Sequence, residues 1–137
     1  MSTRITIPFD VTGWDETPYA TPADGPHRTR VTVRKAFRGA LEGESTAELL
    51  TCQSDPSDPS AGAGYVASEH VVGRLGGRSG AFVVQHGGIV GGGEAPRSFG
   101  NVVPGSGTGD LAGLRGTVVF YRDDLGQHTL TLDYDLD

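Results

Sequence analysis

Cysteine is nearly absent from this 137-residue sequence, which contains Cys52 alone. One cysteine cannot form an intrachain disulfide, so the sequence excludes a small secreted scaffold held together by disulfides. Residues 1–5 also lack the apolar segment that is typical of a signal peptide. These two absences together predict a cytoplasmic protein.

Positive charge and long apolar runs are scarce as well. The sequence has 11 lysines and arginines against 17 aspartates and glutamates, a formal net charge of −6. Nucleic acids and anionic membranes attract basic surfaces, so this balance argues against both. No apolar run approaches the roughly 20 residues that a membrane-spanning helix needs. We therefore expect neither nucleic acid nor a membrane as a partner.

Motifs for metals and phosphate are missing too. Four histidines are present, but no His-x-His or Cys-x-x-Cys pair supplies two ligands at short spacing. The glycine-rich run 105–109 is not followed by Gly-Lys-Ser or Gly-Lys-Thr, which a phosphate-binding loop needs, and a barrel corner explains it better. We expect no metal and no cofactor.

Glycine and proline, by contrast, are abundant, at 22 and 8 residues. They separate short runs in which apolar and polar residues alternate, the period of half-buried strands. No stretch shows the 3.6-residue apolar period of a helix. The sequence predicts one all-β domain over residues 1–137, with about seven or eight antiparallel strands in a small barrel or a sandwich.

The alternating runs place the expected elements along the chain. The expected strands and hairpins cover residues 5–11, 28–37, 46–53, 64–86 and 118–136. The segments expected to be loops, turns or flexible connections are 13–26, 39–45, 54–62 and 87–93.

The longest expected element is the β-hairpin over residues 64–86. Two glycines at 76–77 separate its apolar runs, and glycine suits the positive φ that a two-residue hairpin turn requires. With the turn at this position, Glu69 directly faces Val84 and lies diagonal to His86 on one face. The backbones of the diagonal pair are then roughly 7–8 Å apart.

A carboxylate beside an imidazole is a candidate acid–base pair, so Glu69 and His86 are the expected catalytic residues. Burial raises the pKa of a carboxyl group, and we expect the pKa of Glu69 to be raised toward neutrality. The alternative is a structural glutamate whose hydrogen bonds fix the shape of the core. The side chains expected to line a ligand site are those of Trp14, Tyr65, Phe82, Val84, Phe99 and Tyr134.

Two further expectations concern the faces of the strands. Lys35 falls on the apolar face of its strand, and we expect its ammonium group to reach out to solvent. The hairpin face opposite Glu69 carries Val66, Val72 and Val83 and is too apolar for open solvent. Further copies of the chain, in a homodimer or a homotrimer, are expected to cover it.

Five segments carry a resemblance to a known family: FDVTGW (9–14), KAFRGALEG (35–43), YVASE (65–69), GRSGAF (77–82) and VPGSGTGDL (103–111). They resemble a bacterial family of uncharacterised proteins, domain of unknown function 3224. The resemblance implies an eight-stranded antiparallel β-barrel similar to that of allene oxide cyclase. Allene oxide cyclase is a cofactor-free enzyme that folds a reactive apolar substrate within its lumen. The resemblance concerns the fold and implies no established activity.

Two functions follow as hypotheses, each with a small apolar molecule as the partner. A cofactor-independent cyclase or isomerase would confine a polyketide-like or oxylipin-like substrate in the lumen while Glu69 and His86 move protons. A non-catalytic binding protein would hold the same class of molecule, with Glu69 orienting it. In a third, purely structural interpretation, side chains fill the lumen.

Overall fold

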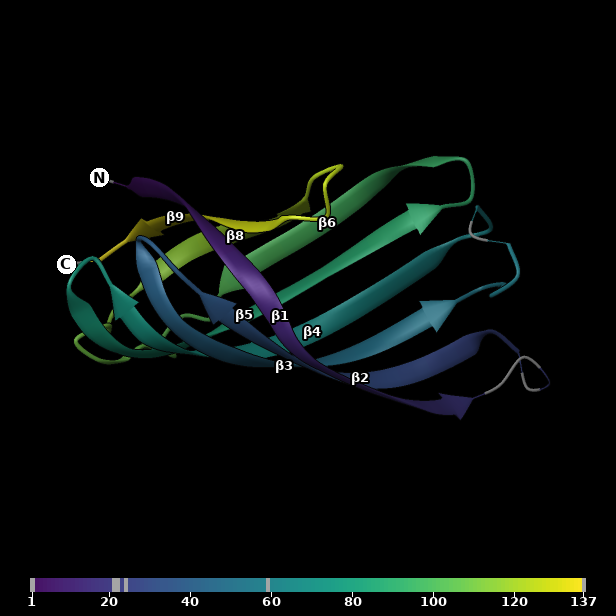
Figure 1. Ribbon diagram of the computed structural model, residues 1–137, viewed down its shortest axis with the longest axis horizontal. Helices are drawn as coiled ribbons and strands as arrows, with labels where there is room; N and C mark the ends of the chain where they lie inside the picture. The colour runs from purple at the N-terminus through teal and green to yellow at the C-terminus, as the bar shows by residue number, and fades with distance from the viewer. Residues whose placement is uncertain (1, 21–22, 24, 59, 137) are drawn as a thin grey trace.

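Figure 1 shows the computed structural model of the chain, which describes residues 2–20, 23, 25–58 and 60–136. The strands are antiparallel, and the described residues contain no α-helix. They accordingly include no helix that is long and apolar enough to cross a membrane. The strands are β1 (Thr3–Ala20), β2 (His27–Phe37), β3 (Leu41–Gln53), β4 (Ala63–Leu75), β5 (Arg78–Gly91), β6 (Glu94–Val102), β7 (Thr108–Gly109), β8 (Arg115–Arg122) and β9 (His128–Asp135).

Eight of these strands form a closed ring. Hydrogen-bonded neighbours follow the order β4-β3-β2-β1-β9-β8-β6-β5, and a further pairing of β4 with β5 closes the ring. The two-residue strand β7 pairs with β5 at Gly80 and Ala81. The predicted all-β, antiparallel, eight-stranded barrel is therefore confirmed as a barrel-like ring, in place of a sandwich of two sheets.

The ring is tight at one end and open at the other. Residues 3–9 of β1 pair with β9, whereas residues 13–20 of the same strand pair with β2. β8 meets β6 at Asn101 and Thr117. Strands β1–β6 therefore extend beyond β8 and β9, toward the right in Figure 1. We call these extensions the open half, and the end that contains β8 and β9 the closed half. The open half comprises residues 13–20, 27–33, 47–53, 63–67, 86–91 and 94–99.

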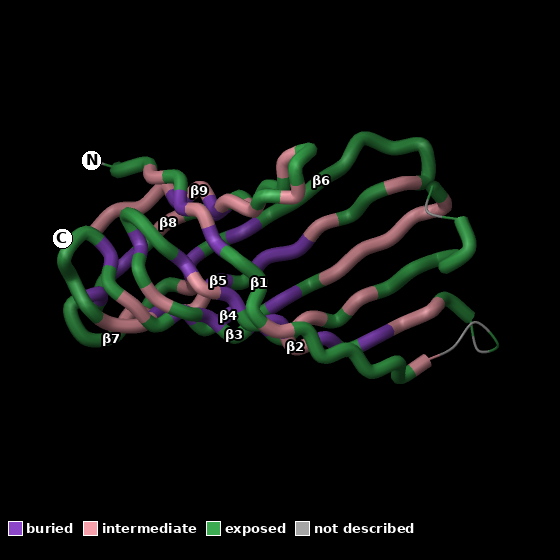
Figure 2. Tube along the Cα trace, in the orientation of Figure 1, coloured by how far each residue is buried: buried purple, intermediate pink, exposed green. Residues whose placement is uncertain are grey.

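The main hydrophobic core fills the closed half, where buried residues gather in Figure 2. Ile7, Phe82 and Leu132 are among its fully buried side chains, and they come from β1, β5 and β9. The open half holds a much smaller cluster, Val31, Val33 and Ala47, with Leu49 packed against it. The closed half therefore carries most of the packing that stabilises the fold.

Two expected strand boundaries are wrong. β1 continues to Ala20 through the stretch expected to be a loop, and the ladder to β2 passes register shifts near Gly13 and Pro18. A bulge lets an edge strand continue past residues that would otherwise end it. β3 begins at Leu41 instead of 46, because Gly39, at a φ of 93°, makes the preceding turn short.

The expected flexible connection after residue 86 is also wrong, because β5 runs through it to Gly91. Glycine lies within the strand here to make room for aromatic rings. A Cβ atom at Gly87 would lie 2.6 Å from Cε1 of Phe99, and one at Gly88 would lie 3.3 Å from Cε1 of Tyr65. Glycine in a strand marks this kind of close approach.

The central hairpin is confirmed in position and register. Gly76 and Gly77 form its turn with φ angles of 56° and 84°. Glu69 faces Val84 across the hairpin, and Ala67 faces His86 in the same ladder. The expected lumen face is the buried one: Glu69 is 1% exposed and His86 is 4% exposed.

Candidate functional site

The inner faces of β2, β3, β4 and β5 are aligned in register, so their residues form rows across the sheet. Directly opposed residues on antiparallel strands share a face. Successive rows lead from the closed half to the open half. The rows are Lys35, Ser45, Val71 and Phe82; then Val33, Ala47, Glu69 and Val84; then Val31, Leu49, Ala67 and His86; and last Thr29, Thr51, Tyr65 and Gly88.

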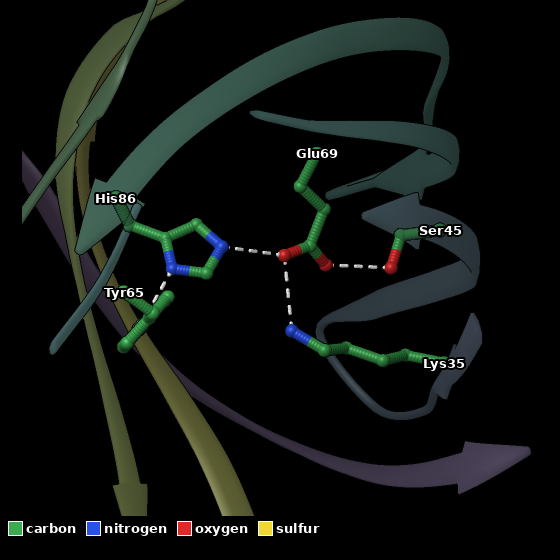
Figure 3. Close-up of polar contacts among 5 residues, drawn as sticks. All are labelled: Lys35, Ser45, Tyr65, Glu69 and His86. Carbon is green, nitrogen blue, oxygen red and sulfur yellow. Dashed lines mark hydrogen bonds and ion pairs between the residues drawn. The ribbon is translucent and has the colours of Figure 1, made fainter. Parts of the chain in front are cut away.

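Glu69 lies where the two halves meet, and three side chains bind its carboxylate. Oε1 accepts a hydrogen bond from the Lys35 ammonium at 2.9 Å and lies 2.8 Å from His86 Nε2. Oε2 accepts a hydrogen bond from Ser45 Oγ at 2.6 Å. Figure 3 shows these groups converging on Glu69 from three different strands. The sheet register thus surrounds a buried carboxylate with the partners it needs.

The expected shift in the pKa of Glu69 is wrong in direction. Burial by itself raises this pKa. The hydrogen bond with His86, the charge of Lys35 and the hydrogen bond from Ser45 lower it by more than burial raises it, so the pKa falls from 4.5 to about 2. The expectation considered burial and left out the partners that the register supplies. Glu69 is therefore a carboxylate at neutral pH and holds a negative charge there.

Lys35 is buried, so the expectation that it reaches out to solvent is also wrong. The residue is 8% exposed, and its ammonium group turns inward because Glu69 lies one row away. Nζ lies 4.1 Å from the ring centroid of Phe120 and 5.1 Å from that of Phe9, within the range of cation–π attraction. Burial lowers the pKa of Lys35, while the charge of Glu69 acts to raise it.

His86 connects this ion pair to the open half. Its Nδ1 lies 3.0 Å from the Tyr65 hydroxyl, and its ring centroid lies 4.3 Å from that of Phe120. Burial, followed by the negative charge of Glu69, raises the pKa of Tyr65, so the phenol keeps its proton at neutral pH. A hydrogen-bonded chain therefore runs from Lys35 and Glu69 through His86 to Tyr65.

A cavity of about 490 Å³ occupies the inner face of the open half, beyond Tyr65. Trp14 and Leu49 contribute to its apolar wall, and His27 and Gln53 contribute polar groups. This volume is in the range of small-molecule sites. Tyr65 lines the cavity, and its hydroxyl contacts His86, so this residue joins the cavity to the buried chain.

Two of the six expected ligand residues meet at this cavity. Trp14 and Tyr65 both line it, although they come from β1 and β4. Trp14 is 56% exposed, and its Nε1 donates a hydrogen bond to Glu16 Oε1 at 3.0 Å. The indole therefore lies on the rim and leaves the cavity accessible.

The other four expected ligand residues lie elsewhere. Phe82 and Val84 are each 1% exposed within the main core, and Tyr134 packs against that core. Phe99 lies over Gly87 on the outer face and is 56% exposed. None of these four lines the cavity beside Tyr65.

Sequence reasoning missed Lys35 and Ser45 as partners of Glu69. A signal for Lys35 was present, since a lysine on the apolar face of a strand must either bend to solvent or find a buried anion. No such signal existed for Ser45. Its position depends on the register between β2, β3 and β4, which pairs Lys35 with Ser45 and Ser45 with Val71.

The outer face of the open half carries exposed apolar side chains, of which Val66 belongs to the hairpin face expected to be covered. Leu50, Val66, Ile89 and Phe99 are each at least half exposed on it. The homodimer or homotrimer expected to cover this face stays a prediction. In the part of the chain that the structure describes, no three His, Cys, Asp or Glu side chains come close enough to hold a metal ion.

These observations define a class of protein: a barrel-like all-β domain whose open end contains a cavity backed by a buried Lys–Glu–His–Tyr chain. Residues 5–134 match the family described as "Protein of unknown function (DUF3224)", and the chain belongs to this family. The family predicted from the sequence is thus confirmed.

A solved structure supports the same assignment. It is the crystal structure of a protein with unknown function from the DUF3224 family of Shewanella oneidensis MR-1, 38% identical in sequence, with a TM-score of 0.83. The similarity covers 100% of this chain and 99% of that chain. No curated protein matches the sequence. The likeness to allene oxide cyclase stays a prediction.

Proposed function

We propose that this protein binds a small, mainly apolar molecule in the cavity of its open half. The observation that supports this most is the position of Tyr65, which lines a cavity of about 490 Å³ and is hydrogen-bonded to the buried His86. Binding sites for small molecules combine an apolar wall with a few fixed polar groups. Here the wall includes Trp14, Leu49 and Val90, and the polar group that we assign to the ligand is the Tyr65 hydroxyl, which His86 holds.

The Lys35–Glu69 pair has a positioning role in this proposal. Glu69 holds His86 through Nε2, and His86 holds the Tyr65 hydroxyl through Nδ1. A polar group that is held in place before binding loses less entropy when a ligand arrives. The buried charges therefore act on the ligand through Tyr65 and do not touch it.

A neutral fluorescent probe, N-phenyl-1-naphthylamine, tests the binding proposal. We expect its emission to rise saturably, with one site per chain, as the probe leaves water. The variant Ala63→Phe adds bulk inside the cavity and is expected to abolish the signal. Ala112→Phe, at an exposed turn residue, is the matched control and should bind as the unmodified chain does. Equal probe binding by Ala63→Phe would rule out this cavity.

A second candidate function is the cofactor-independent isomerase or cyclase, and the chain from Tyr65 to His86 favours it. In such a reaction the Tyr65 oxygen takes a proton from a C–H bond of the ligand as its own proton passes to His86 Nδ1, and the resulting enolate takes a proton back at another carbon as both transfers reverse. Glu69 stabilises the resulting imidazolium through Nε2. Glu69 itself keeps its charge, so its role differs from the acid–base role expected from the sequence.

Proton exchange distinguishes the two candidates. An enolisable ketone such as 2-tetralone is incubated with the protein in D₂O at a concentration that saturates the site, and deuterium at its acidic C–H positions is measured by mass spectrometry. An isomerase is expected to accelerate exchange, and Tyr65→Phe is expected to remove the acceleration while still binding N-phenyl-1-naphthylamine. Exchange at the uncatalysed rate, with binding intact, would leave the binding protein as the function.

The location that we propose is the cytoplasm. Cys52 is free and exposed on β3, and an exposed thiol is compatible with a reducing compartment.

A further inference from the structure

The directions of the hydrogen bonds in the buried chain determine what Tyr65 can offer to a ligand. This inference deepens the proposed binding function and rests on it. Lys35 can only donate, and its Nζ lies 2.9 Å from Oε1 of Glu69. Ser45 donates to the other oxygen. Glu69 is therefore an ionised carboxylate that only accepts, in agreement with its lowered pKa.

The tautomer of His86 follows from the ionisation of Glu69. His86 Nε2 lies 2.8 Å from Oε1, and a carboxylate oxygen cannot donate a hydrogen bond. Nε2 must therefore carry the hydrogen. This fixes one end of the imidazole and leaves the state of Nδ1 as the remaining variable.

The groups that contact His86 include one anion, Glu69, and Lys35 shares it. Lys35 and His86 contact the same carboxylate oxygen, and Lys35 already balances the single negative charge of Glu69. His86 is 4% exposed, so a second cation there would be a buried charge with no anion of its own. Nδ1 of a neutral imidazole with hydrogen on Nε2 has a lone pair and accepts a hydrogen bond.

Tyr65 is therefore the donor in its contact with His86. The hydroxyl oxygen lies 3.0 Å from Nδ1, and with this tautomer the only hydrogen of the hydroxyl is used there. What remains on the oxygen is acceptor capacity, and Tyr65 is a residue of the cavity wall. Glu16, another cavity residue, adds a carboxylate to the wall, which disfavours an anionic ligand.

We propose that the cavity selects neutral molecules that carry a hydroxyl or N–H group and donate it to the Tyr65 oxygen. Alcohols, phenols, enols and aromatic amines of mainly apolar character fit this requirement. Ketones and ethers of the same shape, which can only accept, leave the Tyr65 oxygen without a partner. Leaving a buried acceptor unpaired disfavours such ligands.

Matched pairs of neutral ligands test the selection. We compare 2-naphthol, a donor, with 2-methoxynaphthalene, an ether of similar shape, by isothermal titration calorimetry. The unmodified protein is expected to bind 2-naphthol about fivefold more tightly, which corresponds to about 1 kcal/mol. In Tyr65→Phe this ratio is expected to fall to about one, because the ring stays and the acceptor is lost.

The control variant and the fold of the test variant are checked separately. Tyr121→Phe removes a tyrosine hydroxyl from an exposed position on β8, and it should keep the fivefold ratio. Binding of 2-methoxynaphthalene within twofold of the unmodified affinity shows that the cavity of Tyr65→Phe is intact.

The possible outcomes separate this inference from the function on which it rests. Equal affinity of the two ligands for the unmodified protein, or tighter binding of the ether, would overturn the inference while the binding function stands. A preference for 2-naphthol that persists in Tyr65→Phe would also overturn it. Binding of neither ligand, nor of N-phenyl-1-naphthylamine, would overturn both. A preference that disappears with the hydroxyl of Tyr65 supports the inference.

Discussion

The closed and open halves of the ring use the same strands in different ways. In the closed half the inner face is filled by large side chains such as Leu41, Phe82 and Leu130, each at most 1% exposed. In the open half the buried cluster consists of the smaller side chains Val31, Val33 and Ala47, and β8 and β9 do not reach over it (Figure 1). One end of the sheet thus stabilises the fold, and this leaves the other end free to hold a ligand.

The largest expected effect comes from the core of the closed half. Phe82→Ala removes a fully buried ring and is expected to lower the free energy of unfolding by about 4 kcal/mol. Leu49→Ala, in the open half, removes a partly buried side chain and should cost about 1 kcal/mol. Urea unfolding measures both. Equal losses would contradict the division of the ring into a packed end and a free end.

The next largest loss of stability is expected at the boundary between the halves, where Lys35 pairs with Glu69. Lys35→Met leaves the buried carboxylate of Glu69 without its cation and is expected to cost about 3 kcal/mol of unfolding free energy. The double variant Lys35→Met/Glu69→Gln removes both charges and should regain most of this loss. The test is a double-mutant cycle by urea unfolding. A double variant as unstable as the sum of the single variants would mean that the pair is not coupled.

Acid is expected to reduce the stability that the Lys35–Glu69 pair contributes, over a defined range of pH. The pKa of Glu69 is about 2 in the fold against 4.5 for the free group, so the stability it contributes is complete above pH 4.5. As the pH falls toward 2 this contribution is lost. Thermal unfolding from pH 6 to 2 is expected to show a steeper fall for the unmodified chain than for Lys35→Met/Glu69→Gln. Parallel curves would contradict the lowered pKa.

A smaller effect is expected in the open half at Gly88. A Cβ atom there would lie 3.3 Å from Cε1 of Tyr65, so Gly88→Ala must displace the ring by a few tenths of an ångström. We expect the dissociation constant of N-phenyl-1-naphthylamine to rise about threefold, or about 0.6 kcal/mol. Urea unfolding should change by less than about 1 kcal/mol. Unchanged affinity would show that the exact position of Tyr65 is unimportant for binding.

The smallest effect on stability is expected on the outer face. Val66→Glu places a charge on an exposed position of β4 and should leave the unfolding free energy within about 0.5 kcal/mol. If copies of the chain cover this face, light scattering should give the mass of a dimer or trimer, reduced to one chain by the substitution. A single-chain mass for the unmodified protein would contradict the predicted oligomer.

The parts of this structure that depend on residues close in sequence could be predicted from the sequence. The turn at Gly76 and Gly77 fixes the register of one hairpin, so the closeness of Glu69 and His86 could be predicted by counting residues. The ends of β1 and β5 could not, because the continuation of each depends on a partner strand. Pro18 and Gly88 look like loop residues until the neighbouring strand or ring is known.

The candidate site, too, could be predicted from the sequence only where it depends on local pairing. Lys35 and Glu69 are 34 positions apart and come together through two successive ladders, from β2 to β3 and from β3 to β4. An error of one residue in either ladder would place Lys35 and Glu69 on opposite faces of the sheet. The sequence predicted a buried glutamate but not its ion pair, and this error reversed the expected shift of its pKa.

The pairing of β1 with β9 has a consequence for how the chain reaches its fold. Ile5 pairs with Leu132, so the two ends of the sequence must meet before the closed half can form. During synthesis the strands β2 to β5 leave the ribosome before β9 does. The apolar inner faces of their hairpins therefore stay exposed to solvent until β9 can pair with β1. Pairing across such a sequence separation is slow. We therefore expect the closed half, which holds the main core, to be the last to assemble.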